Sequence, residues 1–87
     1  MALVSISPVA ASVAWDSRNA LPARIRFGDR DHRVVRVGCV RDERAAYPLG
    51  SSPRLTVVVE LDSGESVELV FDARRRRWFV DALDAAA

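Results

Sequence analysis

Residues 54–72 read RLTVVVELDSGESVELVFD, two segments of alternating residues around a short polar connection. The apolar side chains share one face of each segment: Leu55, Val57, Val59 and Leu61, then Val67, Leu69 and Phe71. This period of two is typical of strands with one buried face. The connection Ser63-Gly64-Glu65 suits a three-residue loop, because Gly64 accepts a positive φ. We therefore predict an antiparallel hairpin that pairs Leu61 with Val67, Val59 with Leu69 and Val57 with Phe71.

A further hairpin is predicted upstream, between Ala23–Phe27 and Arg33–Val40, with turn residues at 28–32. Its expected register sets Ile25 opposite Val35 and Ala23 opposite Val37, which keeps apolar residues together. The same register sets Arg24 opposite Arg36. We expect Cys39, in the second of these strands, to be a small buried hydrophobe.

The rest of the chain adds strands and one irregular stretch. Residues 9–15 suit an additional first strand, and Trp78–Leu83 a last strand after a turn at 73–77. Residues 41–53 have two prolines and no periodicity, so we predict a long loop there. Five to six short strands must curl to bury their apolar faces, which predicts an all-β fold: a small antiparallel barrel or curled sheet, SH3-like. The 87 residues form one domain, 1–87, with frayed ends at 1–8 and 84–87.

Composition limits the class of protein. The chain is 49% hydrophobic and 29% charged with a formal net charge of +1, which is ordinary globular composition rather than that of a polycation. One cysteine excludes an internal disulfide framework and fits a reducing compartment. The apolar N-terminal run has no preceding positive charge and contains Pro8, unlike a secretory leader. We expect a cytoplasmic protein that does not enter a membrane.

Catalytic and metal-binding patterns are not found. Nucleophilic catalysis needs an activating base, and His32 is the single histidine. Asp31 and His32 are adjacent, so in an extended strand their side chains point to opposite faces and do not form a catalytic dyad. We expect His32 to be a solvated turn residue instead. One histidine and one cysteine are too few for a zinc site, and the four glycines are too scattered to hold a phosphate. We predict no enzyme activity, no metal and no cofactor.

All basic residues are arginine, and two groups of them are candidates for binding an anion or nucleic acid. The candidates are Arg24, Arg26 and Arg36 on the first hairpin, and Arg74, Arg75, Arg76 and Arg77 with Trp78 at the last turn. Each group has an alternative interpretation. Glu60 and Glu68 face each other in the predicted second hairpin and would neutralise the first group. The second group would be a solvated turn with Trp78 in the core.

Valines on the outer faces point to protein association. Val58 and Val70 are expected to lie opposite each other, with Val34 and Val40 on the outer face of their strand. Such residues are covered either by another chain or by this chain's own loops. The leading prediction is a non-catalytic interaction module that binds a partner protein or forms a homodimer. The alternative is a nucleic-acid-binding domain that uses the arginines and Trp78.

Four segments resemble a known family. They are residues 21–28 (LPARIRFG), 32–37 (HRVVRV), 67–72 (VELVFD) and 77–80 (RWFV), spread over most of 20–83. They are similar to an uncharacterised small β domain family of high-GC bacteria, some members of which are appended to Y-family DNA polymerases. The resemblance implies an all-β fold and a DNA-repair setting for the interaction, and it implies no activity.

Overall fold

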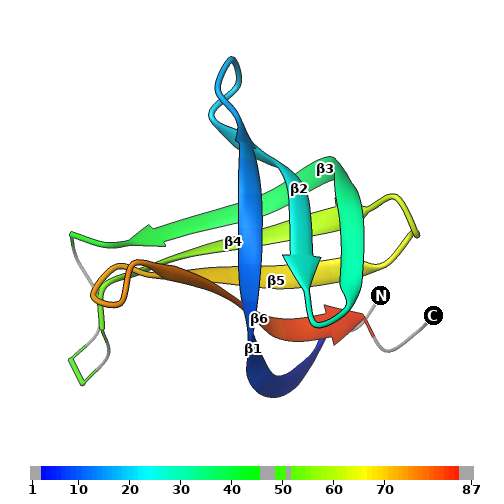
Figure 1. Cartoon of the computed structure of the whole chain (residues 1–87). Helices are drawn as coiled ribbons and strands as arrows, with labels where there is room; N and C mark the ends of the chain where they lie inside the picture. The colour runs from blue at the N-terminus through cyan, green and yellow to red at the C-terminus, as the bar shows by residue number, and fades with distance from the viewer. Residues whose placement is uncertain (1–2, 46–48, 51, 85–87) are drawn as a thin grey trace.

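Six antiparallel strands form a closed barrel in this computed structural model, which describes residues 3–45, 49–50 and 52–84 (Figure 1). They are β1 (Leu3–Asp16), β2 (Leu21–Phe27), β3 (Arg30–Glu43), β4 (Arg54–Leu61), β5 (Ser66–Asp72) and β6 (Arg77–Asp84). Each strand pairs with the next along the chain, and β1 pairs with β6 to close the ring. The predicted small all-β barrel is confirmed. No helix in the described part of the chain is suited to cross a membrane.

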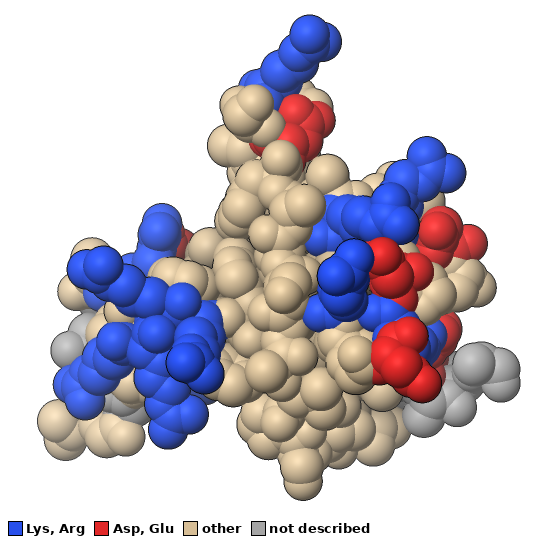
Figure 2. Space-filling model, viewed as in Figure 1, with Lys and Arg blue, Asp and Glu red and all other residues tan. Residues whose placement is uncertain are grey.

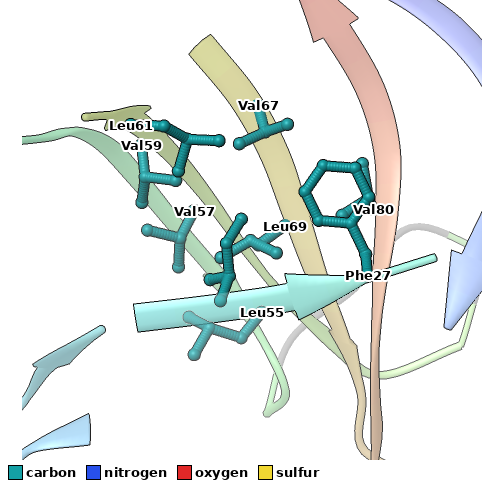
Figure 3. Packing of buried hydrophobic residues seen from close by; sticks show 9 residues of the cluster. Phe27, Leu55, Val57, Val59, Leu61, Val67, Leu69 and Val80 are labelled. Atoms are coloured by element: carbon teal, nitrogen blue, oxygen red, sulfur yellow. The ribbon is translucent and has the colours of Figure 1, made fainter. Parts of the chain in front are cut away.

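The core lies between the inward faces of β4 and β5 and those of β2 and β6 (Figure 3). Ile25, Val67, Leu69 and Val80 have no exposed surface. The faces predicted for β4 and β5 are correct, since Leu55, Val57, Val59 and Leu61 are buried and Phe71 packs against them. Burial of these side chains is the main force that holds the strands together.

The register predicted for β4 and β5 is wrong by two residues. Val59 pairs with Val67, Val57 with Leu69 and Leu55 with Phe71. The loop is Asp62-Ser63-Gly64, closed by a bond from the Leu61 N–H to the Glu65 carbonyl (2.8 Å). Gly64 has φ +90°, and three-residue loops need their left-handed residue in the last position. Placing Gly64 last moves the loop one residue toward the N-terminus, from 63–65 to 62–64, and so changes the pairing register by two residues. A two-residue change leaves every side chain on the face of the sheet that was predicted for it.

The connection between β2 and β3 is also tighter than predicted. Gly28 and Asp29 alone form the turn, and Gly28 has φ +57° in the first central position, as a type II′ turn requires. Arg24 therefore faces Arg33, not Arg36, and Ile25 faces His32, not Val35. His32 lies in β3 rather than in the turn.

Two register shifts in β3, after Val34 and after Val37, change which side chains face inward. Val34 and Val37 pack against the core, whereas Val35 is 57% exposed. Cys39 is exposed, so the prediction of a buried cysteine is wrong, because the bulges interrupt the alternation on which it depended.

The predicted loop at 41–53 begins later than expected. Arg41–Glu43 belong to β3 and pair with Arg54–Thr56 of β4. Residues 46–48 and 51 of this loop lie outside the described residues.

The N-terminal segment is a full strand of the barrel. β1 extends the predicted 9–15 strand at both ends and pairs with both β2 and β6. Leu3 pairs with Asp84, so β1 and β6 include Leu3–Pro8 and Asp84 from the ends 1–8 and 84–87 where we predicted fraying. Residues 1–2 and 85–87 lie outside the described residues.

Candidate functional site

Three aromatic side chains from different strands meet at one end of the barrel. Phe71 of β5 and Trp78 of β6 are cross-strand partners, with ring centroids 5.2 Å apart and ring planes at 51°. Trp15 of β1 approaches Trp78 at 5.7 Å. A register shift between Ala14 and Trp15 precedes this contact. Both tryptophans of the chain thus belong to one aromatic cluster, whose tilted packing is favourable.

This cluster forms one wall of an apolar cleft of about 620 Å³. Other lining residues come from the end of β3 and from the beginning of β4, where Leu55 pairs directly with Phe71. The lining is formed by Trp15, Asp16, Ser17, Ala20, Leu21, Pro22, Val40, Asp42, Arg44, Leu55, Val57, Phe71 and Trp78. Arg44 donates to both carboxylate oxygens of Asp42 (2.9 and 2.7 Å). These hydrogen bonds lower the pKa of Asp42 to about 2.

The cleft exists because β2 and β3 separate early. Their pairing covers only Arg24–Phe27 with Arg30–Arg33, after which β3 pairs with β4 alone among the described strands. Figure 1 shows the β1–β2 hairpin projecting from the body while β3 turns away beside β4. We call the side of Val34–Glu43 that faces away from β4 the β3 edge. A second hollow of about 460 Å³ lies between this part of β3 and residues 21–23 of β2.

The arginines of the first hairpin are neutralised, but by a different acid than predicted. Arg24 Nε lies 2.6 Å from Asp31 Oδ1, and Arg26 lies 3.3 Å from Asp31 Oδ2. The hydrogen bond from Arg24 lowers the pKa of Asp31. Only the pairing of Arg36 with Glu60 (3.1 Å) follows the predicted ladder. Glu60 faces Ser66 rather than Glu68, so the predicted glutamate pair is absent.

The four arginines of the last turn are exposed and lie together at the β5–β6 connection. Asp72 Oδ1 accepts hydrogen bonds from the backbone N–H groups of Arg74 and Arg75 (3.0 and 3.2 Å), which fixes the turn. The one ion pair of these arginines among the described residues joins Arg75 to Asp72 at 3.9 Å. Figure 2 shows blue atoms gathered at this end of the molecule, whereas blue and red atoms alternate on the opposite side.

The two predicted groups are therefore separate. The structure places Arg24, Arg26 and Arg36 on the β2–β3–β4 surface and Arg74–Arg77 at the aromatic end of the barrel. Trp78 is half-buried: it packs against the edge of the core, in part as the alternative interpretation expected, and it also lines the cleft. Sequence patterns missed Trp15 and Leu21, which enter the cleft only because the β1–β2 hairpin extends past the barrel.

A polar cluster joins the β2–β3 turn to the β4–β5 loop. His32 Nδ1 lies 2.8 Å from Asp62 Oδ1, and Arg30 pairs with Glu65. The His32 side chain is 20% exposed, so the prediction of a solvated turn residue is wrong. The hydrogen bond from His32 lowers the pKa of Asp62. No group of three potential metal ligands occurs in the described part of the chain.

The lowered pKa values predict a loss of stability in acid. A carboxyl whose pKa is lower in the folded state stabilises the fold above its unfolded pKa, and this contribution disappears as the pH falls through the folded value. We expect the free energy of unfolding to decrease as the pH is lowered below about 4, the pKa of aspartate in the unfolded chain.

The variant Asp31→Asn should be less stable than wild type at pH 7, and its free energy of unfolding should decrease less than that of wild type between pH 5 and pH 2. Urea unfolding at each pH measures this. Asp29→Asn is the control, since Asp29 makes no ion pair within the described ranges; equal slopes for both variants would contradict the prediction.

The outer-face valines are rearranged relative to the prediction. Val58 faces Glu68 and Val70 faces Thr56, and both valines are half-buried. Val34 packs against the core, so of the four only Val40 is well exposed, at 54%.

No family model, curated protein or solved structure matches the chain. We therefore infer a function from the geometry of the cleft and of β3 alone. The family resemblance and the SH3-like character of the barrel therefore stay predictions.

Proposed function

We propose that this chain is a non-catalytic interaction module that binds an extended segment of a partner protein along the β3 edge. The observation that supports it is the early separation of β2 and β3, which leaves Val34–Glu43 paired on one side only within the described residues. An added strand supplies the backbone hydrogen bonds that such an edge lacks.

The side chains beside this edge suit an apolar segment. Val35 and Val40 are exposed on β3, and Trp15 and Leu21, which line the cleft together with Val40, are 45% and 39% exposed. The volume of the cleft lies within the roughly 300–1,000 Å³ that is typical of ligand sites. Alternate side chains of an added strand would enter the cleft while its backbone pairs with β3.

Selection from a random twelve-residue peptide library displayed on phage tests this function. We expect wild-type protein to enrich peptides with alternating apolar residues. Val40→Glu should weaken their binding at least tenfold, because the new carboxylate would lie at both the β3 edge and the cleft. Fluorescence anisotropy of dye-labelled selected peptides measures the dissociation constants.

The matched control is Val4→Glu. Val4 is 49% exposed on β1, where it pairs with Leu83 of β6 and does not line the cleft. We expect this variant to bind as wild type does. Failure to enrich any peptide, or equal binding by both variants, would overturn the proposal. A wild-type dimer on a sizing column that Val40→Glu dissociates would identify a second copy, rather than a partner, as the occupant.

Nucleic-acid binding is the second candidate, favoured by the exposed arginines at 74–77. It predicts affinity for single-stranded DNA that falls steeply with salt and is lost when Arg74–Arg77 become alanine. Absence of binding at low salt would remove it. A DNA-repair setting for the partner remains part of the proposal through the family resemblance alone.

A further inference from the structure

We infer that the segment bound at the β3 edge carries aspartate or glutamate beside its apolar residues, and that the Arg74–Arg77 turn receives those acids. This inference rests on the proposed function and specifies the chemistry of its ligand. The cleft and the turn are consecutive in one hairpin, because the Phe71–Trp78 pair is followed by the Asp72–Arg77 pair. A segment that leaves the cleft past Trp78 therefore meets the arginines next.

The charge of the turn is not balanced locally. Within the described ranges the four arginines form one ion pair, from Arg75 to Asp72 at 3.9 Å, and Asp72 Oδ1 already accepts two backbone hydrogen bonds. Arg24, Arg26 and Arg36, by contrast, each lie within 3.3 Å of a carboxylate oxygen. With a net charge of only +1 on the whole chain, the excess at this turn is a local feature. Arginine is well suited to bidentate contacts with carboxylates.

The cleft favours a peptide over a nucleic acid as the occupant. Its lining is mainly apolar, and two of its three charged residues are Asp16 and Asp42. Arg44 pairs with Asp42, whereas Asp16 has no ion pair among the described residues, so a strand with a phosphate at every nucleotide would bring negative charge against Asp16, which is unfavourable. Trp78 is packed against Phe71 and Trp15, which restricts stacking of its ring on a base. A peptide with acids at one end only avoids both problems.

The test compares two double variants in the same peptide selection. Arg74→Gln with Arg76→Gln removes two charges from the turn, and neither residue has an ion pair in the part of the chain described. Arg24→Gln with Arg26→Gln removes two charges from the paired group and is the control. We expect peptides selected on wild type to be rich in aspartate and glutamate on one side of their apolar residues. Their affinity at 50 mM salt should fall about tenfold in the turn variant and less than twofold in the control.

The outcomes separate this inference from the function on which it rests. If apolar peptides are enriched without acids, or if glutamine-for-glutamate peptides bind equally well, the inference is wrong and the proposed function stands. If no peptide is enriched, both are wrong. If a single-stranded twelve-nucleotide DNA binds more tightly than every selected peptide and the turn variant abolishes this binding, nucleic acid replaces the acidic segment as the ligand.

Discussion

Replacing Leu69 with alanine is expected to lower the free energy of unfolding by about 2–5 kcal/mol. Leu69 has no exposed surface and lies in β5 between Val57 of β4 and Val80 of β6. Its truncation removes apolar contacts to both neighbouring strands and leaves a cavity that close-packed side chains fill only in part. Small domains have total stabilities of about 5–15 kcal/mol, so the change is a large fraction of the whole. Urea unfolding followed by circular dichroism measures it.

Two further variants keep this prediction testable. Val35→Ala is the matched surface control, because Val35 is 57% exposed, and we expect it to change stability by less than about 0.5 kcal/mol. If Leu69→Ala does not fold, Ile25→Val at another fully buried position should cost about 0.5–1.5 kcal/mol. A cost below about 1 kcal/mol for Leu69→Ala in a cooperatively unfolding protein would contradict the core assignment.

The strands could be predicted from the sequence because their patterns are local. The alternation in 54–72 identifies the buried face of β4 and β5 without knowledge of the rest of the chain. The register could not be predicted as well, since it depends on which residue takes the left-handed position of the loop. Gly64 is central in the predicted loop and last in the observed one, and this difference alone shifts every pair by two.

The candidate site was harder to predict because it depends on contacts between distant residues. The two-residue turn at Gly28-Asp29 moves Arg33 opposite Arg24 and brings Asp31 between Arg24 and Arg26. Cys39 is exposed because two bulges interrupt the pairing of β3 with β4 and change which side chains face inward. The alternation of residues within β3 alone does not indicate these bulges. The cleft requires the separation of β2 from β3, which no periodicity encodes. Sequence patterns did indicate the exposed arginines at 74–77 as a run of four, Trp78 beside them and Val40 on an outer face.

Replacing Trp15 with alanine is expected to weaken binding of the selected peptides by about 30- to 150-fold, or roughly 2–3 kcal/mol, with little effect on folding. Trp15 is 45% exposed, lines the cleft and contacts Trp78. Half-exposed side chains contribute less to stability than core ones, and we expect a loss below about 1.5 kcal/mol. Anisotropy with the labelled peptides measures the affinity, and urea unfolding of the same samples measures the stability.

The comparison of Trp15→Ala with Trp15→Phe separates a direct contact from a change in the barrel. Phenylalanine keeps an aromatic ring beside Trp78 and should retain affinity within about fivefold, because most of the apolar contact area remains. If alanine at this position leaves affinity unchanged in a folded protein, the cleft is not where the segment binds. Val40 belongs to both the β3 edge and the cleft, whereas Trp15 lines only the cleft. If Trp15→Ala binds the peptides as wild type does and Val40→Glu does not bind them, the binding site is limited to the β3 edge.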